Sequence, residues 1–134
     1  MRVIIDANVA IAAAATRGLC DAVMELCFER HHLIIGEGIF AEIGEKLVKK
    51  IKVPSAVAAD YLELLRHQAE LINPEAVDPK TCRDPKDLMV LGLVAPGDAE
   101  VIVTGDKDLL VLESFQGAAI MTPRAFWELN QSKP

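Results

Sequence analysis

Four short runs of apolar residues restrict the fold of this chain more than any other feature of its sequence. In none of the four do polar and apolar residues alternate. Continuous apolar runs are typical of strands buried on both faces, as in parallel sheets that helices cover. The sequence therefore predicts buried strands over residues 3–5, 33–35, 101–103 and 118–121.

Helical patterns lie between these runs. Apolar residues recur at helical spacing over residues 19–30 and 40–51. Pro54 and Pro123 each suit the first turn of a further helix, because proline lacks the N–H that this turn leaves unpaired. The helix that Pro54 opens is predicted to end at residue 71, with four side chains facing inward: Val57, Tyr61, Leu64 and Leu65.

The apolar segment 88–95 has no decisive periodicity, and the residues before it assign it to a helix. Asp84 and Pro85 are typical of a helix cap followed by a first helical position. A short helix is also predicted over residues 107–112. The resulting alternation of strands and helices indicates the α/β class with a mainly parallel sheet.

Length, charge and cysteine content narrow the class of protein. A chain of 134 residues suits one domain over residues 1–134. A net charge of −6 argues against nucleic-acid binding through a broad basic surface. Three cysteines without a CxxC pair do not suggest a disulfide framework. With no membrane-length apolar run and no signal-peptide core before Asp6, we expect a cytoplasmic protein without membrane contact.

Acidic residues follow two of the predicted strands. Asp6 comes directly after the first strand, and Asp106 follows Thr104 at the end of the strand over 101–103. Ligands of open α/β sheets bind outside the carboxyl ends of the strands, and Asp87 begins a helix that can reach this edge. Converging carboxylates repel one another unless a cation lies between them. The sequence thus predicts a site for Mg²⁺ or Mn²⁺, which prefer oxygen ligands.

Each acid also has a plainer interpretation. Asp84 and Asp87 could only cap a helix, Asp6 with Asn8 could form a turn, and Asp106 could cap the short helix after it. On the polar face of the helix over 40–51, periodicity alone does not distinguish a functional Glu42 from Glu45. The lysines of this region are either a solvated surface or a rim that follows an RNA backbone: Lys46, Lys49, Lys50 and Lys52.

Four segments of the chain together resemble the successive motifs of PIN domains, in particular the toxin-type branch related to VapC. The segments are residues 3–9, 40–43, 82–87 and 103–110, and the run Thr-Gly-Asp-Lys-Asp-Leu-Leu over 104–110 is the strongest of them. The resemblance covers almost the whole chain. It implies a three-layer α/β/α fold and an endoribonuclease that depends on Mg²⁺ or Mn²⁺. An antitoxin partner and a homodimer are implied as well.

The resemblance also implies a set of site residues. The catalytic and metal-binding quartet would be Asp6, Glu42, Asp87 and Asp106, with support from Asn8, Asp84, Thr104 and Asp108. The chain departs from the family pattern at Ala7 and Gly36, where Thr or Ser is common, and in the loop 95–100. The first two departures remove hydroxyl groups near the site, which would lower activity while leaving every proposed metal ligand in place.

Two other functions compete with this interpretation. A degraded site would leave a catalytically weak or inactive module that binds RNA or a partner protein. Phosphoryl transfer with Asp6 as the nucleophile would call for a second aspartate two residues later, where Asn8 stands. An RNA-hydrolysing, metal-dependent enzyme is therefore the main prediction, with the toxin of a toxin–antitoxin pair as its expected role.

Overall fold

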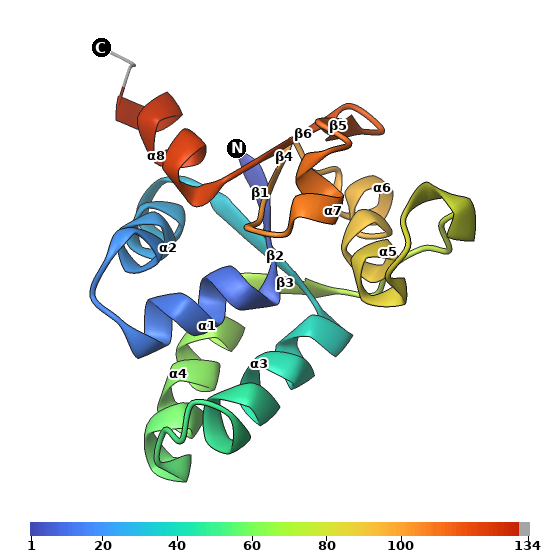
Figure 1. Ribbon diagram of the computed structural model, residues 1–134. Helices are drawn as coiled ribbons and strands as arrows, with labels where there is room; N and C mark the ends of the chain where they lie inside the picture. The colour runs from blue at the N-terminus through green and yellow to red at the C-terminus, as the bar shows by residue number, and fades with distance from the viewer. Residues whose placement is uncertain (132–134) are drawn as a thin grey trace.

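The computed structural model describes residues 1–131, and its centre is a six-stranded sheet in the order β3-β2-β1-β4-β6-β5 (Figure 1). All neighbouring strands are parallel except β5 and β6. The predicted α/β class with a mainly parallel sheet is therefore confirmed. Residues 132–134, the end of the predicted domain, lie outside the described residues. The strands are β1 (Arg2–Ile5), β2 (His32–Gly36), β3 (Ala69–Ile72), β4 (Val101–Val103), β5 (Ser114–Phe115) and β6 (Ala118–Met121).

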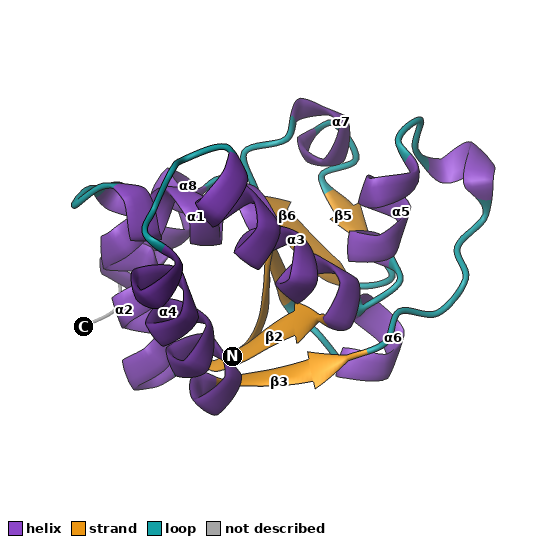
Figure 2. Cartoon of the chain, turned by 90° about the horizontal axis from the view of Figure 1, so that it is seen from below, coloured by secondary structure: helices purple, strands orange, loops and turns teal. Residues whose placement is uncertain are grey.

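Helices flank the sheet, which confirms the predicted α/β/α arrangement. In Figure 2, α1, α2 and α4 gather on one side and α5 and α6 on the other. Ile4, Ile34 and Ile102 occupy neighbouring central strands and are fully buried, each stabilising the fold by roughly 1.5–3 kcal/mol relative to exposure. The helices are α1 (Ala7–Ala15), α2 (Leu19–Arg30), α3 (Glu37–Lys49), α4 (Ser55–Gln68), α5 (Pro85–Leu91), α6 (Val94–Gly97), α7 (Lys107–Leu110) and α8 (Pro123–Gln131).

The helix α1 was not predicted from periodicity. Its sequence, Ala-Asn-Val-Ala-Ile-Ala-Ala-Ala-Ala, has apolar residues on most sides and hence no clear stripe. Alanine has the highest intrinsic helix propensity, and this term rather than amphipathicity explains the helix. The Asp6 carboxylate caps it by accepting a 2.7 Å hydrogen bond from the Ala7 N–H, so α1 starts at the end of β1.

The predicted helix over 54–71 was too long. It ends at Gln68, and the next four residues form β3, which pairs with β2 at one edge of the sheet. Leu65 is fully buried as predicted and Tyr61 is half-buried, but Val57 and Leu64 are 55% and 43% exposed. The helical period was right, whereas the width of the buried stripe was overestimated.

The segment 88–95 is not one helix, because the chain breaks it at Gly92 between α5 and α6. A Cβ at this position would lie 2.3 Å from the backbone oxygen of Glu75. The Glu75 N–H also donates a 2.8 Å hydrogen bond to the Gly92 carbonyl. The loop before α5 thus passes against Gly92 so closely that only glycine fits.

The sequence suggests neither a disulfide framework nor a membrane-length apolar run. Cys20, Cys27 and Cys82 are all free thiols, and Cys27 and Cys82 are buried. Within residues 1–131, every helix is too short or too polar to cross a membrane.

Candidate metal centre

Two parallel strands bring acidic side chains to the same edge of the sheet. Ile5 of β1 is in register with Val103 of β4, so the residues that follow them, Asp6 and Thr104, are neighbours. The fully buried Thr104 hydroxyl donates a 2.7 Å hydrogen bond to Asp6 Oδ2. The same hydroxyl accepts a 3.0 Å hydrogen bond from the Asp106 N–H. Thr104 therefore fixes the chain around both acids.

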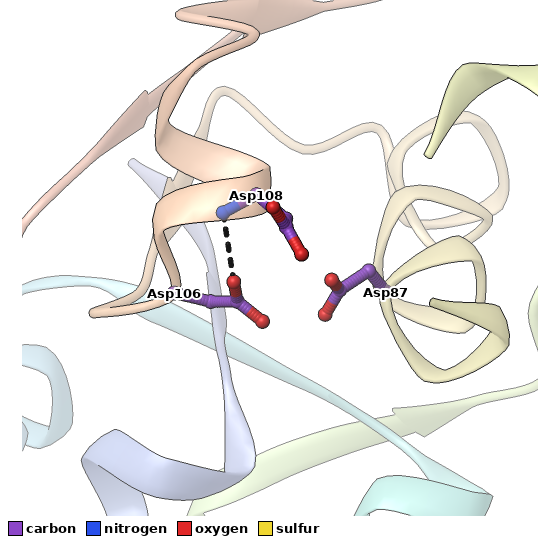
Figure 3. Close-up of side chains that lie close together, drawn as sticks. All are labelled: Asp87, Asp106 and Asp108. Atoms are coloured by element: carbon purple, nitrogen blue, oxygen red, sulfur yellow. Dashed lines mark hydrogen bonds between the residues drawn. The ribbon is translucent and has the colours of Figure 1, made fainter. Parts of the chain in front are cut away.

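Asp106 is both a helix cap and a member of an acidic cluster. Its Oδ1 accepts a 2.8 Å hydrogen bond from the Asp108 N–H and so caps α7, as the plainer interpretation predicted. Asp87, Asp106 and Asp108 nevertheless each offer a carboxylate oxygen within 4.8 Å of the other two. Figure 3 shows the Asp87 side chain reaching from α5 towards the two carboxylates at the start of α7. Asp106 therefore caps α7 and at the same time belongs to the acidic cluster.

The structure separates the roles of Asp84 and Asp87. Asp84 is exposed and caps α5 by accepting a 2.9 Å hydrogen bond from the Lys86 N–H. Asp87 is only 4% exposed, and burial, together with the proximity of Asp106, raises the pKa of its carboxyl to about 7. Burial likewise raises the pKa of Asp6, although its hydrogen bonds from Thr104 and Ala7 oppose the effect. An isolated cap would not be buried against other acids.

Glu42 reaches the same site from α3. Its two carboxylate oxygens face two lysines: Oε2 lies 3.6 Å from the Lys46 ammonium and Oε1 lies 3.3 Å from that of Lys86. Glu45, one turn on, is more exposed and pairs with Lys49 instead. A cavity of about 170 Å³ is lined by Asp6, Asn8, Glu42, Lys46, Asp84, Lys86, Asp87 and Asp106.

The predicted residues therefore meet in one place. Asp6, Glu42, Asp87 and Asp106 line a common cavity with Asn8 and Asp84. Thr104 donates a hydrogen bond to Asp6, and Asp108 belongs to the acidic cluster beside that cavity. Ala7 is buried at the start of α1, and Gly36 precedes α3 without a side-chain cap, so the hydroxyls expected by the family pattern are absent from both helix starts.

Three contacts of the site were missed by reasoning from sequence. The Cys82 thiol lies 3.6 Å from Asp87 Oδ2 and donates to it. Arg83 pairs with Asp108 at 2.7 Å. Lys86 approaches Glu42 from a different helix. Cys82, Arg83 and Lys86 all belong to the segment 82–87, which resembles a family motif. This resemblance was the sequence signal that could have identified them.

The chemistry of the donors fits a divalent cation. All the converging ligand atoms of the cluster are carboxylate oxygens, the donors that Mg²⁺ and Mn²⁺ prefer over nitrogen or sulfur. Burial, with a smaller effect of neighbouring acids, raises the pKa of Asp6 and of Asp87, so a further positive charge would favour their ionised forms. A cation would supply this charge.

A mainly parallel sheet has helices on both faces and an acidic cluster at the carboxyl ends of β1 and β4, and these features together define the class of the protein. The family model for the PIN domain matches residues 2–108. The chain therefore belongs to the PIN-domain family, whose members are generally nucleases and typically use divalent metals. This confirms the resemblance that the four sequence motifs indicated.

Comparison with solved structures supports the fold. PAE2754 from Pyrobaculum aerophilum is similar with a TM-score of 0.71 and 19% identity, over 99% of this chain and 91% of that one. VapBC2 from Rickettsia felis, solved with a DNA fragment from its promoter, is similar with a TM-score of 0.67 and 14% identity, over 91% of this chain and 98% of that one. A search of curated proteins finds no significant match.

Proposed function

We propose that this protein is a metal-dependent endoribonuclease that hydrolyses RNA phosphodiester bonds. The observation that carries the proposal is the convergence of Asp87, Asp106 and Asp108 next to Asp6 and Glu42. These acids come from four separate segments of the chain and share one edge of the sheet. Membership of the PIN-domain family adds support, because its members are generally nucleases.

Asp6, Glu42, Asp87 and Asp106 are the residues that would hold Mg²⁺ or Mn²⁺, with Asp108 beside them. Such a cation, when bound, lowers the pKa of water and neutralises charge on the scissile phosphate and the leaving oxygen. Thr104 keeps the Asp6 carboxylate directed at the cavity. The Glu42 carboxylate, which lines the same cavity, either joins the ligands or accepts a hydrogen bond from the attacking water and orients it.

Ser, Cys and His nucleophiles have no place in this proposal. Catalysis by charge stabilisation and positioning needs no covalent intermediate. Since water is the attacking group, the 2′-hydroxyl of RNA does not take part, and the products should carry no 2′,3′-cyclic phosphate. This feature distinguishes hydrolysis at the acidic cluster from cleavage by a contaminating ribonuclease that uses the 2′-hydroxyl.

The proposal is tested by incubating the purified protein with single-stranded RNA in Mg²⁺, in Mn²⁺ and in excess chelator. We expect cleavage with either metal, none in chelator, and products without cyclic phosphate ends. Asp6→Asn should reduce the rate at least ~100-fold, since each ligand contributes several kcal/mol of charge stabilisation. Metal-independent cleavage would overturn the metal mechanism. RNA binding without cleavage would favour the inactive module instead.

We further propose that the enzyme is the toxin of a toxin–antitoxin pair and acts in the cytoplasm. The structural similarity to VapBC2 from Rickettsia felis supports the first part of this proposal. Co-expression with the protein encoded by the adjacent gene should yield a complex that cleaves RNA more slowly than the free enzyme. Unchanged cleavage by the complex would argue against an antitoxin role for that neighbour.

A homodimer is part of the same proposal. Exposed apolar side chains occur on α3, just after it, and on α4: Val48, Ile51, Val57 and Leu64. Light scattering at ~10–50 μM, the affinity range of weak interfaces, should give the mass of a dimer. Val57→Asp should shift it to a monomer, whereas Val111→Asp, at a valine that is 74% exposed after α7, should not. A monomeric wild-type protein would contradict the proposal.

A further inference from the structure

Glu42 is held between two lysines that come from different helices. Lys46 lies one turn further along α3, and its ammonium is 3.6 Å from Oε2. Lys86 lies in the first turn of α5, and its ammonium is 3.3 Å from Oε1. Each lysine thus pairs with a different oxygen of the same carboxylate, although the two lysines are 40 residues apart in the sequence.

Both lysines line the acidic cavity. Among its lining residues are five carboxylates and two ammonium groups, so the cavity as a whole is acidic. RNA brings a further negative charge with every phosphate, and the protein itself carries −6. Binding RNA here requires positive charge placed within a few ångströms of the reacting phosphate, because charges beyond a Debye length of about 8 Å are screened at physiological salt.

From this arrangement we propose that Lys46 and Lys86 bind the phosphates of the RNA substrate on either side of Glu42. This inference rests on the proposed function and assigns its substrate contacts. In the free protein the two ammonium groups neutralise Glu42. A cation held by Glu42 would free the two ammonium groups for phosphate oxygens, so that metal and RNA binding would support each other.

The side-chain chemistry suits this exchange. A lysine ammonium is a compact charge on a flexible four-carbon stem, so it can move from a carboxylate to a phosphate at little cost. The side chain of Lys46 is 31% exposed and that of Lys86 is 66% exposed, so both can reach an incoming strand. Their Glu42 contacts, at 3.3 and 3.6 Å, are ion pairs that solvent partly screens.

Two neighbouring lysines provide matched controls. Lys49 lies on α3 one turn beyond Glu45, and its ammonium pairs with the carboxylate of that exposed residue. Lys80 precedes α5 in the chain and is exposed. Neither lysine lines the cavity. Replacing them removes the same charge from the protein without touching the proposed phosphate contacts.

The first measurement is RNA affinity and its salt dependence. Fluorescence anisotropy of a labelled single-stranded RNA would use the protein with its acidic cluster unchanged, in Ca²⁺, which also binds carboxylate oxygens, under conditions in which no cleavage product forms. We expect Lys46→Gln and Lys86→Gln each to weaken binding about three- to ten-fold. Each should also lower the slope of log affinity against log salt by about 0.7, the value for one phosphate contact on a single strand. Lys49→Gln and Lys80→Gln should leave both quantities nearly unchanged.

The second measurement separates substrate binding from neutralisation of Glu42. In cleavage assays with Mg²⁺, Lys46→Gln and Lys86→Gln should each raise KM with little change in kcat. Mn²⁺ affinity, followed by the loss of the free-ion electron paramagnetic resonance signal, should stay the same or tighten, since a competing positive charge is gone. If RNA affinity and salt slope stay at the wild-type values while Mn²⁺ binds more tightly, the lysines only neutralise Glu42 and the proposal is wrong.

The outcomes also distinguish this proposal from the proposed function. A protein that fails to cleave RNA, but whose RNA affinity still falls in Lys46→Gln and Lys86→Gln, would retain the phosphate site and lose the nuclease assignment. Metal-dependent cleavage with equal loss of affinity in all four lysine variants would retain the nuclease and overturn the specific roles of Lys46 and Lys86. A wild-type protein with no measurable RNA affinity would overturn both.

Discussion

The hydroxyl of Thr104 donates a 2.7 Å hydrogen bond to Oδ2 of Asp6 and so connects the ends of two parallel strands. The two residues are 98 positions apart in the sequence, and both are buried. The same hydroxyl accepts a hydrogen bond from the Asp106 N–H. One side chain therefore fixes the positions of two of the proposed metal ligands.

Removing this hydroxyl should weaken both the fold and the site. Thr104→Val keeps the shape of the side chain but leaves Asp6 Oδ2 and the Asp106 N–H without this partner. We expect a loss of about 1–3 kcal/mol in the free energy of unfolding, with weaker Mn²⁺ binding. Thr104→Ser keeps the hydroxyl and serves as the control. Urea denaturation and Mn²⁺ titration check this, and a Val variant that matches the wild type in both would contradict it.

Substitutions at Asp84 and at Asp87 should change the stability of the metal-free protein in different directions. Asp84→Ala removes the cap of α5 and should lower stability by about 1 kcal/mol, whether or not metal is present. Asp87→Asn relieves repulsion within the acidic cluster, so the variant should be at least as stable as the wild type in chelator. It should also gain less stability from added Mg²⁺.

Melting curves with and without Mg²⁺, beside one cleavage assay, measure this difference. The proposed role of Asp87 predicts a large loss of cleavage in Asp87→Asn. A variant that is destabilised in chelator yet cleaves RNA at the wild-type rate would mean that Asp87 serves only the start of its helix.

The strand-end acids and the helix start at Asp84 could be predicted from the sequence, because both depend on local patterns. Asp6 directly follows one apolar run typical of a buried strand, and Asp106 comes three residues after the end of another. The choice of Glu42 over Glu45 could not be derived from helical periodicity, since both lie on the polar face of α3. The family resemblance selected Glu42, and the structure places it in the cavity.

Other features depended on contacts between distant segments. The break at Gly92 follows from the passage of Glu75 against it, which no local pattern reveals. The edge strand β3 follows α4 directly. Its sequence is not a continuous apolar run like those of the central strands. The approach of Lys86 to Glu42 joins two helices that are far apart in the sequence, so it became visible only in the structure.

Stability in the absence of metal should fall as the pH rises from about 4 to about 7. The carboxyl of Asp87 has a pKa of about 7 in the folded protein, raised mainly by burial, against about 3.9 in an unfolded chain. Between these values the folded state binds the proton more strongly, so raising the pH favours unfolding. The raised pKa of Asp6 acts in the same direction.

Urea midpoints should be measured in chelator at pH 5 and at pH 8. The midpoint should fall between these two pH values by more than the other titrating groups alone would cause. Asp87→Asn should reduce this difference, because the amide does not titrate. If the wild type and the variant show the same dependence on pH, Asp87 does not have the raised pKa.

The metal centre is tested most directly at Asp106. Asp106→Asn keeps an oxygen that can accept the hydrogen bond from the Asp108 N–H, and asparagine caps helices about as well as aspartate. The variant should therefore fold like the wild type while losing one negative ligand of the cluster. Mn²⁺ binding and RNA cleavage, measured on the same samples, should fall together, with the cleavage rate reduced at least ~100-fold. A folded Asp106→Asn protein that binds Mn²⁺ and cleaves RNA as the wild type does would contradict the proposed centre.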